Sequence, residues 1–478
     1  MQQLIMGSQS GKKTEDRNQC FHTDVVAGEK LKRMAADVQA LETRDCFTFL
    51  QKYINGKSYG KVCILYGLRH TGKTTLLFQS IAALIEAEMK KAVYIRIRAT
   101  DTMDNLNKDM QLLDMMGYRY YFIDEVTLME DFIDSASLLS DIHAMSGSKV
   151  ILSGAESLCF WFTLNNELYD RAYTLHTTHI PYREYSRVLD IHDIDTYIRY
   201  GGTMKASGSC TEEEVFRDEK SAENYIREAI CRNIRHSLAC CRERKMHHLC
   251  SLYETGQLND AVFRVIENMN YRFLVHVLMH RLQPCGHASA KACRQPQCQE
   301  IQTDILMQID QKAMIRKLMV MLEMRIQECR QDTMTDIHMK EIKGYLKAMD
   351  LIVDCPSESI DGSNVPEEYV LFTQLGVRYC LVQAMVHALL NEPVFQAFSK
   401  QEKKLAADRI LEEVKGQMLA DIVLLETSGC LPKDDKAFRL FFSKGETDMV
   451  IYHAVEDVCE IYEIRHGNRI DNDAYYAL

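Results

Sequence analysis

No stretch of this 478-residue chain approaches the ~20 uninterrupted apolar residues that a membrane-spanning helix needs. The polar start, MQQLIMGSQSGKKTEDRNQ, lacks the apolar segment of a signal peptide. We therefore expect a cytoplasmic protein with no membrane partner. The composition, with 46% apolar and 26% charged residues, is that of a globular protein. The length suggests about two to four domains.

The chain also lacks a cysteine spacing framework and an excess of positive charge. Its 17 cysteines are odd in number and scattered, which indicates reduced thiols. Two groups of cysteine and histidine lack the paired spacing of zinc ligands, so we expect plain thiols there. These groups are Cys240, Cys241, His247, His248 and Cys250, and Cys285, His287, Cys293 and Cys298. The net charge of −11 opposes loose attachment to DNA but leaves room for a local basic groove.

The strongest pattern is a glycine-rich loop between a strand and a helix. KVCILY, Lys61 to Tyr66, is nearly all apolar and predicts a buried parallel strand. After the loop, apolar residues recur at helical spacing from Leu77 to Ile85. The loop between them, GLRHTGKT, has the glycines that let backbone N–H groups face a polyphosphate. We therefore predict ATP binding by Gly67, Leu68, Arg69, His70, Thr71, Gly72, Lys73, Thr74 and Thr75.

Individual roles follow from the chemistry of these side chains. Lys73 would reach the outer phosphates, and the hydroxyl of Thr74 would complete the shell of a Mg²⁺ ion. A second apolar run, YYFIDE, ends in two carboxylates. Asp124 suits the magnesium ion, and Glu125 would orient and deprotonate an attacking water. The sequence therefore predicts ATP hydrolysis as well as binding.

Two further strands are predicted, at residues 92–97 and 149–153. The second one ends in Ser153, whose hydroxyl is a candidate for contact with the γ-phosphate region. The same residue is also compatible with the start of a loop.

The segments GLRHTGKTT, YFIDEV, KVILSGAESL, LYDRAY, HIPYREYSRVLDI and YIRYGGT follow one another along the chain. Through them the chain resembles bacterial and archaeal AAA-type ATPases of the additional-strand P-loop class, from about residue 45 onward. The resemblance implies an α/β P-loop domain with a parallel sheet and a C-terminal restriction-endonuclease-like domain. It also implies that Arg171 approaches the phosphates from the same or a neighbouring subunit, which leaves a homo-oligomer open. Ala155 and Glu156 stand where the family commonly has Thr-Asp.

Beyond Gly202 the pattern becomes helical up to about residue 281. Later, Thr335 or Asp336 is positioned to cap a helix, and the runs LIVD and EYVLFT bracket a polar tip at 356–368. This order of helix, strand, tip and strand is typical of a winged helix. The tip carries Glu358, Asp361, Glu367 and Glu368, which disfavours DNA and favours a protein partner or a spacer role.

The C-terminal runs GETDMVIY and CEIYEIRH alternate and predict two neighbouring strands. Glu463 would share a face with Arg465, and Asp448 would lie on the adjacent strand, making Asp448 and Glu463 a candidate magnesium pair. Arg465 stands where a nuclease carries lysine, and an arginine cannot act as a base.

Ala420 stands where the family places a helix acid, with Asp421 or Glu413 as replacements. We therefore expect a degenerate nuclease fold rather than a working nuclease.

The predicted organisation is an arm at 1–40, a P-loop ATPase domain at 41–205, a helical connector at 206–330, a winged-helix-like unit at 331–395 and a restriction-endonuclease-like domain at 396–478. An ATPase that moves its C-terminal domains with nucleotide state is the leading hypothesis. An ATP-gated nuclease and a nucleotide-stabilised scaffold with little turnover stay open.

Overall fold

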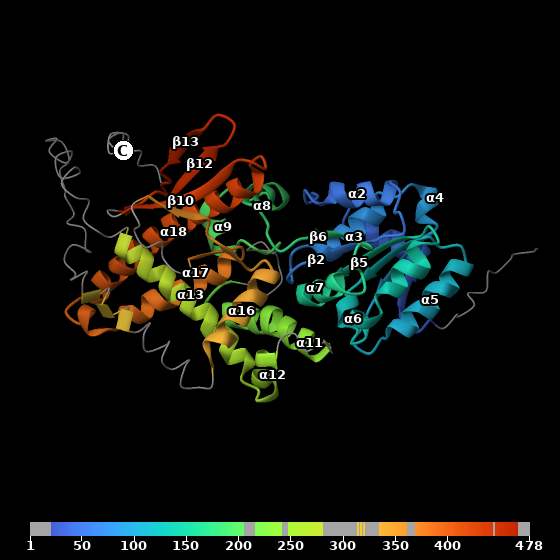
Figure 1. Cartoon of the computed structure of the whole chain (residues 1–478), viewed down its shortest axis with the longest axis horizontal. Helices are drawn as coiled ribbons and strands as arrows, with labels where there is room; N and C mark the ends of the chain where they lie inside the picture. The colour runs from blue at the N-terminus through green and yellow to red at the C-terminus, as the bar shows by residue number, and fades with distance from the viewer. Residues whose placement is uncertain are drawn as a thin grey trace, which may run out of the picture.

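The computed structural model describes residues 21–204, 216–240, 247–280, 334–360, 369–442 and 445–466, with 313, 314, 316, 317, 319 and 320. An α/β lobe, blue to teal in Figure 1, lies beside a second lobe of helices and a small sheet. Residues 1–20 of the expected arm lie outside the described residues. No helix in the described part is long and apolar enough to cross a membrane.

A six-stranded sheet forms the centre of the α/β lobe, in the order β1-β3-β4-β5-β2-β6. The strands are β1 (Asp24–Ala27), β2 (Val62–Tyr66), β3 (Ala92–Arg96), β4 (Tyr120–Asp124), β5 (Lys149–Gly154) and β6 (Ala172–His176). Strands β2 to β6 pair in parallel, which confirms the predicted parallel sheet. Strand β5 lies between β2, which leads into the glycine-rich loop, and β4, which ends in Asp124.

Helices cover both faces of this sheet because its strands are apolar on both sides. One core contains Leu31, Leu50 and Leu76 from helices on one face, and another contains Leu106 and Phe132 from the opposite face. The first face carries α1 (Gly28–Ala36), α2 (Phe47–Asn55) and α3 (Lys73–Ala82); the second carries α5 (Met103–Met115), α6 (Phe132–Ser135) and α7 (Ser157–Asn165). The shorter elements are α4 (Glu86–Met89), η1 (Val126–Leu128) and η2 (Leu139–Ala144).

The expectation for residues 1–40, a mobile arm followed by a short helix, is corrected in part: residues 24–27 form β1, whereas α1 agrees with the expected short helix. Strand β1 extends the sheet antiparallel to β3. The backbone N–H groups of His22 and Thr23 donate to the buried carboxylate of Asp109 on α5, across 3.1 and 2.8 Å. This anchor lies more than 80 residues away in the chain, so a local pattern does not reveal it.

The helical character predicted beyond Gly202 is confirmed for the described residues. The elements beyond Gly202 are α10 (Glu219–Tyr225), η3 (Ile226–Cys231), α11 (Arg232–Cys240), α12 (His247–Glu254) and α13 (Leu258–His280). Two shorter helices, α8 (Tyr182–Leu189) and α9 (Ile194–Tyr200), precede Gly202. The later helices are α16 (Asp336–Ala348), α17 (Leu375–Leu389), η5 (Pro393–Phe395) and α18 (Lys400–Cys430). Long helices α13, α17 and α18 form the body of the second lobe (Figure 1).

The predicted order of helix, strand, tip and strand is found among the described residues with one difference, and the assignment as a winged helix stays a prediction. Thr335 caps α16, and β7 (Ile352–Asp354) pairs antiparallel with β9 (Val370–Phe372). Part of the expected tip, however, forms β8 (Ser357–Ser359), which pairs in parallel with β10 of the C-terminal sheet. Strand β8 is polar and held by backbone pairing, so apolar periodicity gives no sign of it. Residues 361–368 of the tip lie outside the described part.

The small C-terminal sheet has the order β11-β10-β12-β13, with β8 added beside β10. Its strands are β10 (Lys436–Phe442), β11 (Gly445–Glu446), β12 (Met449–His453) and β13 (Val458–Tyr462). Leu424 of α18 packs in one core with Ala437, Met449 and Ile451 of this sheet.

Candidate functional site

The glycine-rich loop joins the carboxyl end of β2 to the first residue of α3, and each glycine has its own steric reason. A Cβ on Gly67 would lie 2.5 Å from Thr177 Oγ1 and 2.9 Å from the backbone nitrogen of Thr178. Gly72 has φ +83°, in the left-handed region, and is the N-cap of α3. The first N–H groups of α3 therefore have no capping side chain and form a site suited to an anion.

Neighbouring segments fix the outside of the loop. The N–H of Leu68 donates to Thr178 Oγ1 across 3.1 Å. The carbonyl of His70, itself at φ +65°, accepts the N–H of Met204 across 2.7 Å. Arg69 and Thr75 are half-buried. The residues from Gly67 to Thr75 thus form one continuous loop and helix start, and their contacts with a nucleotide stay predictions.

The ammonium group of Lys73 is buried and held over the loop. Its Nζ donates to the carbonyl oxygens of Gly67 and Leu68 across 2.9 and 2.8 Å. Burial lowers the pKa of Lys73 to about 8, although the nearby carboxylates of Glu125 and Asp124 act in the opposite direction. A phosphate bound beside Nζ would add a further negative charge and favour the ammonium form.

Asp124 is the centre of a buried polar cluster at the carboxyl edge of the sheet. Its carboxylate accepts hydrogen bonds from Thr74 Oγ1 at 2.8 Å, from the Tyr94 hydroxyl at 2.9 Å and from Ser153 Oγ. The predicted magnesium pair, Thr74 and Asp124, is therefore in direct contact. A hydroxyl and a carboxylate are the hard oxygen ligands that Mg²⁺ prefers, so this donor set fits the ion.

Glu125 follows directly and has an unusual backbone. Its φ of +59° and ψ of +34° are left-handed, a conformation that costs a non-glycine residue about 1 kcal/mol or more. Burial, and then the neighbouring Asp124, raise the pKa of Glu125, while Lys73 and the backbone N–H of Ala155 act against this shift. A half-buried carboxylate with a raised pKa beside a phosphate-binding loop suits a general base.

Ser153 is the last residue but one of β5 and is buried inside this cluster, so it belongs to the strand rather than to the start of an open loop. The described contact is with Asp124, and contact with a phosphate stays a prediction.

Glu156, three residues later, is a feature that sequence reasoning left without a role. It is buried, and its carboxylate lies 2.6 Å from Nδ1 of His236 on α11. Asn233 of the same helix donates to the carbonyl of Ala155 across 3.3 Å. The sequence signal for this contact was that Ala155 and Glu156 stand where the family commonly has Thr-Asp.

Arg171 lies at the opposite edge of the sheet from the loop. Its carbonyl accepts the N–H of Val62, the first residue of β2, and β2 runs roughly 16 Å from there to Gly67. The guanidinium is 44% exposed and pairs with Asp141 across 3.0 Å. This placement does not fit contact with phosphates held by the loop of the same chain, and contact with a neighbouring subunit stays a prediction.

The acids proposed for the C-terminal domain are engaged elsewhere. Asp421 is buried and pairs with Arg378 at 3.1 Å and with Arg439 at 3.0 Å. Glu413 pairs with Arg409 across 2.6 Å. Neither carboxylate therefore replaces the acid missing at Ala420.

The two neighbouring C-terminal strands are confirmed, because β12 and β13 pair antiparallel, but the acids proposed on them lie outside both strands. Strand β13 ends at Tyr462, so Glu463 and Arg465 lie beyond it, and they pair with each other. Asp448 accepts the backbone N–H of Ile464 across 2.7 Å. No cluster of three metal-binding side chains occurs within the described residues. The structure thus gives no support to a magnesium site at Asp448 and Glu463.

The cysteines whose side chains the structure describes are free thiols. The group at 285–298 and Cys241 lie outside the described residues, and the side chains of Cys240 and His247 are not described.

Comparisons with known proteins bear on the α/β lobe. Residues 59–186 match the family model described as AAA domain, a range that holds the loop, Asp124, Glu125 and Ser153. A search of curated proteins found no match. The solved S. cerevisiae Hsp104-ADP complex is similar over 85% of this chain at 12% identity, with a TM-score of 0.30. The chain spans 60% of the length of that structure, and a score this low supports no further argument.

Proposed function

Because the chain carries an AAA domain, a P-loop domain that binds ATP, we propose that it is a magnesium-dependent ATPase whose nucleotide state moves its C-terminal half. The observation that carries this proposal is the 2.8 Å contact between Thr74 and Asp124, with Glu125 next in the chain. It brings two oxygen donors for Mg²⁺ and a candidate base to the mouth of the phosphate-binding loop.

The residues divide the work of phosphoryl transfer to water. Lys73 and the N–H groups at the start of α3 would hold the phosphates, while Thr74 and Asp124 would hold the metal ion. Bound Mg²⁺ would neutralise phosphate charge and polarise the terminal phosphoryl group. Glu125 orients a water molecule and accepts its proton.

Contacts behind the site support the coupling to the second lobe. The backbone N–H of Ala155 faces the carboxylate of Glu125, and the carbonyl of Ala155 accepts from Asn233 of α11. Glu156 pairs with His236 one turn further along the same helix. A change in the charge or position of Glu125 on hydrolysis therefore reaches α11 through a single residue.

Phosphate release by the full chain with ATP and magnesium tests the proposal. Lys73→Ala removes the phosphate-binding ammonium and should abolish release together with nucleotide binding. Glu125→Gln should keep binding and slow release by about 10²- to 10⁴-fold. Lys61→Ala is the matched control, because Lys61 lies at the far end of β2 and pairs with Asp170.

Wild-type release no faster than that of Lys73→Ala would contradict the ATPase. If nucleotide still bound in that case, a scaffold with little turnover would be the better description.

A further inference from the structure

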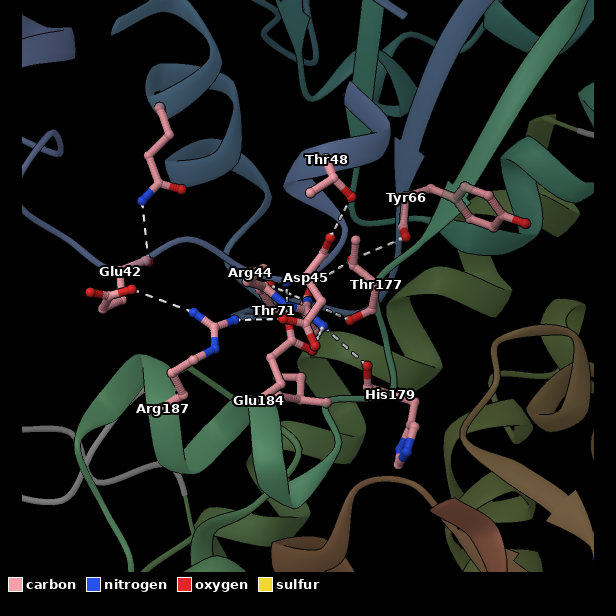
Figure 2. Close-up of polar contacts among 12 residues, drawn as sticks. Glu42, Arg44, Asp45, Thr48, Tyr66, Thr71, Thr177, His179, Glu184 and Arg187 are labelled. Atoms are coloured by element: carbon pink, nitrogen blue, oxygen red, sulfur yellow. Dashed lines mark hydrogen bonds and ion pairs between the residues drawn. The ribbon is translucent and has the colours of Figure 1, made fainter. Parts of the chain in front are cut away.

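Arg44, just before α2, is buried beside the P-loop with every N–H group of its guanidinium directed at an oxygen (Figure 2). Nε and Nη2 form a fork on the carboxylate of Glu184, at 2.8 and 3.1 Å. Nη1 donates to the carbonyls of Thr71 at 2.8 Å and Thr177 at 3.0 Å. Nη2 also donates to the carbonyl of His179 at 3.1 Å. The five donors of an arginine are thus all used.

Glu184 is as fully engaged as its partner. It belongs to the first turn of α8, and its Oε1 accepts the backbone N–H of Asp45 across 2.9 Å as well as Arg44 Nε. Side-chain exposure is 6% for Arg44 and 4% for Glu184. Two charges are retained at such burial only where hydrogen bonds satisfy both of them. Removal of either one leaves the other buried without an opposite charge.

The contact with Thr71 links the Arg44–Glu184 pair to the P-loop, in addition to the two segments that the pair joins. Thr71 lies in the middle of the loop, and its carbonyl is turned toward Arg44. In a planar trans peptide the carbonyl and the following N–H point in opposite directions. Arg44 therefore fixes the N–H of Gly72 so that it points away from the guanidinium. The Thr71 hydroxyl, 2.9 Å from Thr177 Oγ1, is a second contact that restrains Thr71.

On the far side of Glu184, the same turn of α8 is bonded to the second lobe. The backbone N–H of Tyr182, the first residue of α8, donates to the carboxylate of Glu426 on α18 across 2.6 Å. The first turn of α8 is thus held by the P-loop through Arg44 and by the long helix α18 through Glu426.

We propose that Arg44 is a positioning residue of the nucleotide site. It orients the Thr71–Gly72 peptide for phosphate binding and, through Glu184, transmits the position of the P-loop to α8. The inference rests on ATP binding in the proposed function but does not need hydrolysis. ADP is therefore the probe that separates the two.

The test compares Arg44→Lys, Glu184→Gln and Arg187→Gln in the full chain, by titration with a fluorescent ADP analogue in magnesium. Lysine keeps the charge but has three donors and no fork, so the Thr71 carbonyl loses its partner and the dissociation constant should rise about tenfold. Glu184→Gln leaves Arg44 without its counter-charge and should raise the dissociation constant about three- to tenfold.

Arg187 is the matched control because it joins the same two segments, from α8 to Glu42 and Asp45, without touching the loop (Figure 2). Arg187→Gln should bind ADP within about twofold of wild type. Amide exchange in α8, measured at saturating ADP, should respond to nucleotide in wild type and Arg187→Gln but not in Arg44→Lys.

A merely structural role would lower the melting temperature of nucleotide-free Arg44→Lys while leaving its ADP affinity within about twofold of wild type. That result overturns the proposal, as does a nucleotide response of α8 that persists in Arg44→Lys. If Arg44→Lys fails to fold, the ADP affinity of Glu184→Gln decides instead: a value within about twofold of wild type overturns the proposal. Normal ADP binding in wild type without phosphate release would contradict the ATPase alone, whereas no binding would contradict both.

Discussion

Thr74, the last residue of the P-loop, donates its hydroxyl hydrogen bond to Asp124, the last residue of β4, although 50 positions of sequence separate them. Tyr94 from β3 and Ser153 from β5 donate to the same carboxylate. Three parallel strands and the loop thus converge on one acid. The oxygen cluster is assembled by the sheet itself, because the carboxyl ends of parallel strands lie at one edge.

Asp124→Asn should weaken the magnesium-dependent part of ADP binding. An amide lacks the negative charge that attracts the ion, and its NH₂ group presents donors to hydroxyls that are themselves donating. We expect at least about a tenfold loss of affinity with magnesium and little change in EDTA. Tyr94→Phe, which removes one hydroxyl and keeps the carboxylate, should stay within about threefold. Equal losses with and without magnesium would contradict the assigned role.

Nucleotide affinity should fall as the pH rises above about 8. Burial lowers the pKa of Lys73 to about 8 in the free protein. A phosphate favours the charged ammonium, so the pKa is higher in the complex and binding takes up a proton above that pH. Affinity should be constant below pH 8 and fall by up to about tenfold per unit above it. ADP titrations between about pH 6.5 and about pH 9.5 measure this, with a flatter profile expected for Lys73→Arg.

The free energy of unfolding of the nucleotide-free protein should also depend on the protonation of Lys73, but it should increase with pH where the nucleotide affinity decreases. The folded pKa of Lys73 lies below its ordinary value of 10.5, so the unfolded chain binds its proton more tightly. Lys73 therefore contributes a stability that grows as the pH rises from about 8 to 10.5. Thermal melting of wild type and Lys73→Met across this range should show a slope that only wild type has. Identical slopes would contradict a buried, charged Lys73 at neutral pH.

The sequence predicted the P-loop, Asp124 and Glu125 because each lies at a junction between a buried strand and a turn, which short-range periodicity reveals. It did not reveal Arg44 with Glu184, or Glu156 with His236. These partners are 140 and 80 positions apart, and neither side has a local pattern. The resemblance placed Arg171 near the phosphates of the same or a neighbouring subunit, but Arg171 precedes the amino end of β6, and the loop of its own chain lies at the carboxyl end of the sheet. Strand β8 was missed because its SES sequence has no apolar face.

Gly67→Ala should destabilise the protein and weaken nucleotide binding together. The added Cβ would come within 2.5 Å of Thr177 Oγ1 and 2.9 Å of a backbone nitrogen, so the loop or β6 must shift. Overpacking of this kind costs about 1 to 3 kcal/mol. Gly344→Ala is the contrasting variant, because it lies inside α16 with open space around it and should stabilise by about 0.5 to 1 kcal/mol. Thermal melting and ADP titration of both variants measure these effects.

Asp421→Asn should destabilise the second lobe far more than it alters ATP hydrolysis. Asp421 is the shared counter-ion of two buried arginines, Arg378 between the rings of Phe273 and Phe372, and Arg439 over the ring of Tyr369. Removing one member of such a cluster leaves buried charge uncompensated and costs about 3 to 5 kcal/mol.

Glu413→Gln, on the same helix, is the matched control for Asp421→Asn. Its partner is Arg409 one turn away, and loss of a pair of this kind costs roughly 0.5 kcal/mol. Urea unfolding of wild type and both variants separates the two cases. If Asp421→Asn stays within about 1 kcal/mol of Glu413→Gln, Asp421 is not the structural counter-ion inferred from its contacts, and a role for it as a metal ligand would have to be reconsidered.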